Sequence, residues 1–596
     1  MSAAVLPFVL PSQEAINDAE IAQRWLSSLD RALNARDKAA VAALFAPDDC
    51  HWRDVLAFTW FVTPHRGAKE IGAAMVDRQE TTQARGFAIA EGRTPPRRMK
   101  RAGIPVLEAI FSFETAVGRG FGVLRLKADK PTEAFQLLTS LHELKGFEEQ
   151  VGHDRPTGEA HSRNFGGMNW NDIRNKAQLY DDREPAVLVV GGGQAGLTVA
   201  ARLVRLGVDT LVVDKYERAG DCWRKRYHSL ALHNYTDFNH LPYMPFPATW
   251  PSYLPKDMIA NWFEAYVMAM ELNYWASTEF IRGSYDDATG TWNAVVRRGD
   301  GTERTLHPRH LILAGGLNGK PSTPNIPGLK DFKGEVMHSG EFSTGAKWRG
   351  KKAMVFGTGN SAHDVAQDLH SHDVDTTIVQ RGSTTVVSVN PSAKLIHASA
   401  LDGTPLEDSD LIATTNTLPV MKLNLQTISA RMVELDKELI ANLIACGFKW
   451  DMGEDNTGHQ MKIRKRSGGY YLNIGASELV ISGEIGLLQY EQIEKIVPEG
   501  VLLKDGTIKP LDLMVLGTGF QPLETLVREL LGDKVADKIG RVWGLGPDGE
   551  MNNMWKRTAQ EGLWLVGSGL AVCRQYSRVV ALQIKAVEEG LISKKR

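Results

Sequence analysis

The hydrophobic pattern changes its period along residues 18–149. In AEIAQRWLSSLDRAL and DKAAVAALF, apolar residues recur every three or four positions, which predicts two amphipathic helices. The later segments AIFSFETAV, GFGVLRLKA and AFQLLTSLHEL are short and predict strands. Helices followed by a run of strands are typical of a small α+β domain, which we place at residues 15–150. The polar stretch 151–184, rich in Gly and Asn, is predicted to be a linker.

A different pattern begins at Ala186. An apolar run, a glycine turn, an amphipathic helix and a second apolar run follow one another in AVLVVGGGQAGLTVAARLVRLGVDTLVVD, which predicts a β-α-β unit. KKAMVFGTGNSAHDVAQDLHSHDVDTTIVQR begins a second unit. We therefore predict an α/β protein with two Rossmann-type dinucleotide-binding domains behind the N-terminal domain. Residues 185–345 form the first, residues 346–510 the second, and residues 511–596 return to the first.

The first glycine loop has the spacing G-x-G-x-x-G between the predicted strand and helix. Gly191 makes the tight turn, Gly193 lets a pyrophosphate approach the backbone, and Gly196 lets helix and strand pack closely. The second strand ends at Asp214, whose carboxylate is placed to accept hydrogen bonds from a ribose. The loop predicts a dinucleotide site, and its candidate binding residues are Gly191, Gly193, Gln194, Ala195, Gly196, Asp214 and Lys215.

The second glycine loop is G-x-G-x-x-A, an accepted variant of the same fingerprint. The strand that follows ends in Gln380 and Arg381 instead of an acid. An acid would bind a ribose 2′-hydroxyl, whereas arginine can pair with a 2′-phosphate, so this loop favours NADPH over NADH. Its candidate binding residues are Gly357, Gly359, Asn360, Ser361, Ala362 and Arg381.

Two dinucleotide sites in one chain indicate a flavin and a nicotinamide, hence hydride transfer to FAD. Disulfide reductases pass such electrons to a cysteine pair, but Cys222 has no second cysteine near it, and no C-x-x-C pair occurs in the chain. A dithiol acceptor is therefore excluded, and molecular oxygen is the main remaining acceptor.

Composition excludes several other classes. The 69 Lys and Arg residues nearly balance the 71 Asp and Glu residues, so nucleic acid and anionic membranes are not expected partners. No apolar stretch approaches the ~18 residues of a membrane-spanning helix. The apolar N-terminus, MSAAVLPFVLPSQEA, lacks the basic residues of a signal peptide. We expect a cytoplasmic protein without a metal site.

Several ordered motifs carry a resemblance to a known family. FKGEVMHSGEF, with Phe332, Gly334, His338 and Phe342, resembles the F-x-G-x-x-x-H-x-x-x-[FY] signature of class B flavin-dependent monooxygenases. GDCWRKRYHSLALH is similar to the family's G-G-x-W-x-x-x-R-Y segment, and LPYMPFP to its L-P-Y-x-P-F-P stretch. LILAGGLN, which ends at Asn318, and LDLMVLGTGF resemble its two linkers between domains. The likeness runs from about residue 169 to the C-terminus.

The resemblance implies a reaction. In this family NADPH reduces FAD, and O2 then adds at flavin C4a to give a (hydro)peroxide that transfers one oxygen atom to a small organic substrate. The transfer is N- or S-oxygenation, or Baeyer–Villiger oxidation of a ketone. Two alternatives stay open: an NAD(P)H oxidase or quinone reductase with the same cofactors, and a non-catalytic ligand-binding or scaffold protein.

The resemblance also implies roles for single residues. His338 would hold domains and cofactor in register, and Trp223, Arg224 and Gly519 would contact cofactor. Some relatives place an asparagine near C4a, and counting back from the L-P-Y motif without gaps reaches His233, with Asn234 beside it. His338, His233 and Asn234 are therefore the catalytic candidates, and His233 is a cofactor contact as well. Ser343 stands where a lysine often follows the signature, so NADH use beside NADPH stays open.

The N-terminal segment LNARDKAAVAALFAPDDCHWRDVLAFTW resembles the start of the cone-shaped fold of ketosteroid isomerase and nuclear transport factor two, the SnoaL-like fold. That fold often encloses an apolar pocket, which His51 or Asp54 would line. We favour the simpler interpretation that the domain packs against, extends or dimerises the enzyme and that its acids lie at the surface, and a homodimer is left open.

Overall fold

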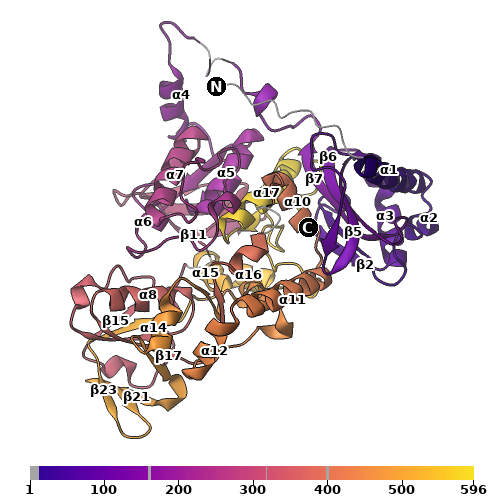
Figure 1. Cartoon of the computed structure of the whole chain (residues 1–596). Helices are drawn as coiled ribbons and strands as arrows, with labels where there is room; N and C mark the ends of the chain where they lie inside the picture. The colour runs from indigo at the N-terminus through magenta and orange to yellow at the C-terminus, as the bar shows by residue number, and fades with distance from the viewer. Residues whose placement is uncertain (1–12, 159–160, 162, 317–318, 398–401, 596) are drawn as a thin grey trace. The chain divides into compact units, whose positions relative to one another are not determined.

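The computed structural model describes residues 13–158, 161, 163–316, 319–397 and 402–595. Asn318 of the LILAGGLN motif and the first twelve residues of the apolar N-terminus lie outside this part. The chain divides into two compact units (Figure 1). The first unit comprises Met1–Glu148, Ser399–Asn424 and Pro547–Glu550, and the second comprises Glu149–Ala398, Leu425–Gly546 and Met551–Arg596.

The first unit places helices before strands, as the hydrophobic periods predict. Its helices are α1 (Gln13–Asn34), α2 (Lys38–Ala42) and α3 (Ala68–Thr82). Its sheet has the order β2-β1-β7-β6-β5-β3, with β4 paired to β5. The strands are β1 (His51–Val55), β2 (Val62–Arg66), β3 (Arg85–Ile89), β4 (Arg97–Arg101), β5 (Ile104–Glu114), β6 (Gly118–Lys127) and β7 (Ala134–Leu144). Residues 399–424 add α10 (Leu406–Thr414) and the start of α11 (Leu418–Leu435) to this unit.

The second unit contains a parallel five-stranded sheet in the order β10-β9-β8-β14-β25. Its strands are β8 (Val187–Val190), β9 (Thr210–Val213), β10 (Asn273–Trp275), β14 (His310–Leu313) and β25 (Leu563–Leu565). Their apolar runs are buried on both faces, as parallel strands require. Helices α5 (Gln194–Arg205) and α17 (Leu570–Glu588) pack against each other beside this sheet (Figure 1). The C-terminal segment therefore returns to the first sheet.

A second parallel sheet has the order β15-β24-β16-β17-β20. Its strands are β15 (Glu335–His338), β16 (Lys352–Phe356), β17 (Asp375–Gln380), β20 (Gly486–Gln489) and β24 (Leu513–Leu516), and α8 (Asn360–Ser371) follows β16. Strands β15 and β24 lie outside the limits 346–510 that the sequence predicts for the second domain. A four-residue apolar run does not reveal which of two parallel sheets it joins, so the sequence boundary fell short on both sides.

The remaining elements of the second unit lie outside these two parallel sheets. The predicted linker contains α4 (Trp170–Ala177), which begins with a capping box between Asn169 and Asp172. Other elements of the first-sheet region are α6 (Asp221–Arg224), α7 (Lys256–Ala269), β11 (Glu279–Asp286), β12 (Thr291–Arg297), β13 (Glu303–Leu306), α15 (Leu523–Leu531) and α16 (Asp533–Ile539). Those of the second-sheet region are β18 (Thr385–Ser388), α12 (Lys437–Ala445), α13 (Gly458–Arg466), β19 (Tyr470–Asn473), α14 (Ala476–Ser482), β21 (Ile493–Val497), β22 (Gly500–Leu503) and β23 (Ile508–Pro510). Within the described residues, no helix has the length and apolarity to cross a membrane.

Candidate functional site

The first glycine loop follows β8 and contains two glycines that close packing requires and one whose side is open. Gly191 has φ +111°, and a Cβ there would lie 2.7 Å from the Ala314 carbonyl oxygen. A Cβ at Gly196 would lie 2.0 Å from the Gly191 carbonyl oxygen, so these two glycines are needed for the chain to pack on itself. Gly193 is different, because the nearest atom to its Cβ position is the Cys222 sulfur at 3.8 Å. The side of Gly193 thus leaves the space that a pyrophosphate needs.

Three helices that follow a strand of the two parallel sheets begin at a glycine whose outer side is open. Gly193 precedes α5, Gly359 precedes α8 and Gly569 precedes α17, and none of them makes a side-chain capping bond. At Gly359 the nearest atom to a Cβ would be the Tyr470 carbonyl oxygen at 3.8 Å, and at Gly569 none lies within 4 Å. The first-turn N–H groups and the positive end of each helix dipole therefore face open space that suits phosphate groups.

Gln194 joins two of these helix starts. Its side chain donates to the Ser568 carbonyl oxygen at 3.1 Å, just before α17, and accepts from the Trp223 indole N–H at 3.2 Å. Gln194 and Trp223, both predicted cofactor contacts, are thus brought together, and Ala195 is buried in α5. Ser568 and Gly569 belong to the C-terminal segment GLWLVGSG, which resembles the closing FAD-contacting element of the family, although neither residue was singled out as a binding residue.

Asp214 shapes the first glycine loop from the end of β9. Its buried carboxylate accepts the backbone N–H groups of Gly192 at 2.5 Å and Tyr216 at 2.9 Å, and burial raises its pKa. The predicted contact with a ribose stays a prediction. Lys215 is exposed, and Arg224 pairs with Asp221, so these two predicted contacts do not join Gln194 and Trp223.

The second glycine loop likewise contains a tightly packed glycine, Gly357, and an open one, Gly359. Gly357 has φ +121°, and a Cβ there would lie 2.3 Å from the Gly517 carbonyl oxygen; Ala362 packs against Gly517 from the other side. The Asn360 side chain accepts the Leu472 N–H at 2.8 Å, so Asn360 ties the start of α8 to β19. Ser361 is half-buried in the first turn of α8.

The end of β17 presents one buried and one exposed polar side chain. Gln380 exchanges two hydrogen bonds with the backbone of Lys449, at 2.9 and 2.7 Å. Arg381 is exposed, and in the described part of the chain its guanidinium has no recorded hydrogen bond or ion pair. Its five N–H donors are therefore open to a phosphate.

His338 lies at the end of β15 and is almost fully buried. Its Nδ1 accepts the Gly340 N–H at 3.1 Å, so Nε2 carries the proton and donates to the Gly519 carbonyl oxygen at 2.9 Å. Burial lowers the pKa of His338, which favours this neutral form. Both ring nitrogens are occupied by backbone, so His338 holds β15 to the turn after β24.

His233 and Asn234 are neighbours in the chain, but His233 lies near a buried carboxylate and Asn234 is exposed to solvent. The His233 Nε2 lies 3.7 Å from the Asp364 carboxylate on α8, and the Tyr227 hydroxyl donates to the same carboxylate. Asp364 is buried, and burial raises its pKa. Asn234 is exposed, and its carbonyl accepts from Asn239. The pairing of Tyr227 and Asp364 was missed, although an acid on the apolar face of a predicted helix is a signal that could have found it.

Comparison with known proteins decides the family. Residues 184–521, more than half of the chain, match the family described as flavin-binding monooxygenase-like. The chain belongs to this family. A rice protein named indole-3-pyruvate monooxygenase YUCCA1 is 29% identical over 340 residues, covering 56% of this chain and 77% of its own. The probable indole-3-pyruvate monooxygenase YUCCA9 of Arabidopsis thaliana is 30% identical over 339 residues, covering 56% and 74%.

Two solved structures are also similar. The flavin-containing monooxygenase of Stenotrophomonas maltophilia is 20% identical, with 67% of this chain and 98% of that chain covered and a TM-score of 0.47. The closed structure of cyclohexanone monooxygenase is 18% identical, with 68% and 85% covered and a TM-score of 0.48. The family match, and not these structures, identifies the protein as an FAD-dependent NAD(P)H monooxygenase.

In this flavin monooxygenase, the segment after Asn234 is held from two sides. The Arg574 guanidinium on α17 donates to the carbonyl oxygens of Phe238 at 2.8 Å and His240 at 2.9 Å. The His397 ring lies on the Phe238 ring, with centroids 3.9 Å apart. Burial lowers the pKa of His397 to about 4, so the imidazole is neutral at pH 7. None of these contacts was predicted, because they join residues that lie far apart in the sequence.

Proposed function

We propose that the protein is an NADPH- and O2-dependent flavoprotein monooxygenase that transfers one oxygen atom to a small organic substrate. FAD binds at the first glycine loop and NADPH at the second. The observation that carries the proposal is the pair of glycine loops, each with an open glycine before an uncapped helix start. When bound, FAD accepts hydride from NADPH and supplies the chemistry that activates O2.

The chain's own residues hold FAD at the first loop. The N–H groups at the start of α5 bind the pyrophosphate, and the start of α17, joined to α5 through Gln194, adds a second positive helix end. Asp214 fixes the conformation of this loop because its carboxylate accepts the Gly192 N–H. Trp223 is fixed by its bond to Gln194, the residue that follows Gly193 in the loop.

The residues at the second loop hold NADPH and select it. The start of α8 binds the pyrophosphate, and Arg381 pairs with the 2′-phosphate because no other side chain in the described residues occupies it. His338 acts as a positioning residue: it fixes β15 against the turn at Gly519 and takes no part in proton transfer, since both ring nitrogens are engaged. This positioning role is the one that the family resemblance implies for His338.

Asp364 and His233 are the polar groups that can move a proton in this region. The Tyr227 hydroxyl and the His233 ring face one buried carboxylate, whose second oxygen has no recorded partner among the described residues. Burial raises the pKa of the Asp364 carboxyl, so this group takes up a proton more readily than an exposed aspartate does. We assign to this cluster, rather than to His338, any acid–base step that the chain supplies.

The substrate class is set by the oxygen transfer itself. Soft nitrogen or sulfur compounds and ketones are both candidates, and the plant relatives named for indole-3-pyruvate add a 2-oxo acid to them. An NAD(P)H oxidase or quinone reductase with the same cofactors is the competing function, because it needs the same two loops and differs only in the fate of the electrons.

Rapid mixing separates these functions. The FAD-loaded protein would be reduced with one equivalent of NADPH without oxygen and then mixed with oxygenated buffer and a sulfide, an amine, a ketone or a 2-oxo acid. A monooxygenase delays the return of the oxidised flavin spectrum, and the right compound shortens the delay and yields one oxygenated product per NADPH. Immediate reoxidation with one hydrogen peroxide per NADPH, whatever compound is added, would refute the proposal.

A further inference from the structure

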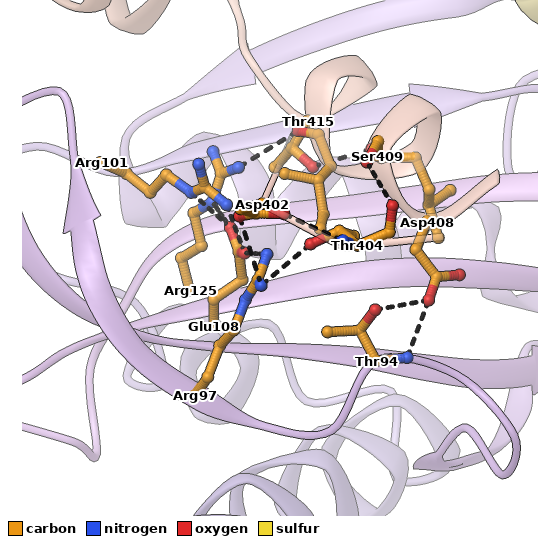
Figure 2. A network of polar contacts seen from close by, with 12 residues as sticks. Thr94, Arg97, Arg101, Glu108, Arg125, Asp402, Thr404, Asp408, Ser409 and Thr415 are labelled. Atoms are coloured by element: carbon orange, nitrogen blue, oxygen red, sulfur yellow. Dashed lines mark hydrogen bonds and ion pairs between the residues drawn. The ribbon is translucent and has the colours of Figure 1, made fainter. Parts of the chain in front are cut away.

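An insertion of the second sheet's region docks within the first unit. Residues 402–424 leave the second unit after η6 (Ala393–His397) and return to it within α11 (Leu418–Leu435). Between these points the segment lies against strands of the N-terminal sheet, with Arg97, Arg101 and Arg125 gathered beside it (Figure 2). We call residues 402–424 the docking segment.

The C-terminal end of α10 is bound by two arginines of the sheet. Arg125 on β6 donates to the Ile412 carbonyl oxygen at 3.1 Å and to the Asn416 side-chain oxygen at 2.8 Å. Arg53 on β1 donates to the Thr414 carbonyl oxygen at 2.6 Å. The last carbonyls of a helix have no partner inside it and carry its negative dipole end, so two cations satisfy both needs.

At the N-terminal end of α10 the acid belongs to the segment and the donors belong to the N-terminal domain. Asp408, in its first turn and 1% exposed, accepts the Thr94 N–H at 2.7 Å, the Thr94 hydroxyl at 2.6 Å and the Arg93 guanidinium at 2.8 Å. Just before the helix, the Thr404 hydroxyl accepts from Arg97 at 3.1 Å (Figure 2). An acid in the first turn complements the helix dipole, and Arg93 and Thr94 pair with it.

Beneath α10 lies a buried charge cluster that is complete only when the segment is present. Glu108 on β5 accepts from Arg101 at 2.6 Å and from Arg125 at 2.9 Å, and both Glu108 and Arg125 are almost fully buried (Figure 2). One carboxylate cannot satisfy the five N–H donors of Arg125 and those of Arg101. Arg125 also donates to the Gln136 side chain on β7 at 2.6 Å, and the oxygen atoms of Ile412 and Asn416 in the segment accept its other bonds, since unpaired buried donors are costly.

The residues predicted to line a ligand pocket are already used by the chain. The His51 Nδ1 lies 3.0 Å from the hydroxyl of Thr417 in the docking segment. The Asp54 carboxylate accepts from the hydroxyls of Thr139 and Thr59 and from two backbone N–H groups. Val420 of the segment is fully buried in an apolar cluster of this unit. The Asp54 carboxylate therefore has no unused bond for a small ligand, whereas the buried His51 Nε2 lies 3.1 Å from the Asp49 carboxylate and makes no hydrogen bond among the described residues.

We propose that the N-terminal domain is an intramolecular receptor for residues 402–424, and that its arginine cluster recognises the two ends of α10 rather than a small-molecule ligand. The proposal goes beyond the monooxygenase reaction and does not depend on it. It gives the extra domain a defined partner, the insertion between β18 and α12 of the same chain.

Hydrogen–deuterium exchange of the full-length, FAD-loaded chain tests this directly. Arg125→Met removes the guanidinium bonded to the end of α10 and keeps an apolar stem of similar length. Arg119→Met is the matched control, because Arg119 lies on the same strand and, within the described residues, forms ion pairs with Glu143 and Glu148 and not with the docking segment. We expect amides of α10 to exchange at least tenfold faster in Arg125→Met and unchanged in Arg119→Met, while amides of α5 keep wild-type rates in both.

A second pair of variants approaches the contact from the segment, in case Arg125→Met does not fold. Asp408→Ala removes the acid held by Thr94 and Arg93, and Glu407→Ala, next to it but 71% exposed, is its control. Faster exchange of α10 in Asp408→Ala alone supports the proposal. Wild-type protection of α10 in both Arg125→Met and Asp408→Ala would overturn it. A chain that light scattering shows to be a dimer, and that Arg125→Met converts to a monomer, would also overturn it by placing the segment in a second copy.

Discussion

Replacing Arg381 by alanine removes the exposed guanidinium at the end of β17 and little else. Arg381 has no recorded partner in the described residues, so the variant should keep the stability of the wild type. A hydrogen bond between charged groups contributes about 1.5–3 kcal/mol, and exposure to solvent and salt places this contact at the lower end. About 1.5 kcal/mol corresponds to roughly a tenfold rise in the KM for NADPH, since ~1.4 kcal/mol is a factor of ten.

The KM for NADH should not change, because NADH lacks the 2′-phosphate that Arg381 would bind. The assay is reduction of bound FAD without oxygen, followed at a series of NADPH and NADH concentrations. Arg349→Ala is the control, since Arg349 is exposed in the same region and pairs with Asp373. An equal loss for NADPH and NADH, or no loss for NADPH, would refute the assignment of Arg381 and the preference for NADPH drawn from it.

Three further predictions follow from contacts at single residues. Gly193→Ala should weaken FAD binding at least tenfold in a fluorescence titration without lowering the melting temperature of the apoprotein, whereas Gly196→Ala should lower that temperature because its Cβ would lie 2.0 Å from a carbonyl oxygen. His338→Ala should destabilise the second unit by about 1–3 kcal/mol in urea unfolding, as two backbone groups lose their partner, yet leave the pH profile of FAD reduction unchanged. Arg101 and Arg125 hold the pKa of Glu108 at about 2 against its usual 4.5, so its carboxylate stabilises the fold above about pH 4.5 and loses this contribution as the pH falls toward 2. Glu108→Gln should therefore cost about 3 kcal/mol in calorimetry at pH 7, and a cost that does not shrink as the pH falls below 4.5 would contradict this origin.

The glycine loops show what a sequence can predict in full. In the first loop the turn, the close helix and the open phosphate side each favour glycine for a local reason, and in the second loop Ala362 takes the place beside the close helix. Both loops can therefore be predicted from the glycine spacing together with the strand and helix on either side. The same logic fails at β15 and β24, because a buried four-residue strand is specified by its neighbours in the sheet and carries no mark of which sheet that is.

The clusters that were missed share one physical property: their partners lie far apart in the sequence. Asp364 meets Tyr227 across the fold, and Arg574 meets Phe238. A buried acid or arginine is a sign that a partner exists, since an unpaired buried charge is costly, but it does not identify the partner. The sequence can therefore indicate that Asp364, on the buried side of α8, needs a donor, and only the structure supplies Tyr227.

The N-terminal domain shows how the same signal supports two opposite interpretations. A buried acid such as Asp54 and a buried histidine such as His51 are expected of residues lining a ligand pocket, and burial does raise the pKa of Asp54 to about 6. The number of bonds already made separates the interpretations. Asp54 accepts from two hydroxyls and two N–H groups, and His51 meets Thr417 of the docking segment. A ligand group would have to displace the hydrogen bonds of Asp54 before it formed its own. The raised pKa of Asp54 therefore reflects burial within a hydrogen-bond network of the chain and does not indicate a ligand site.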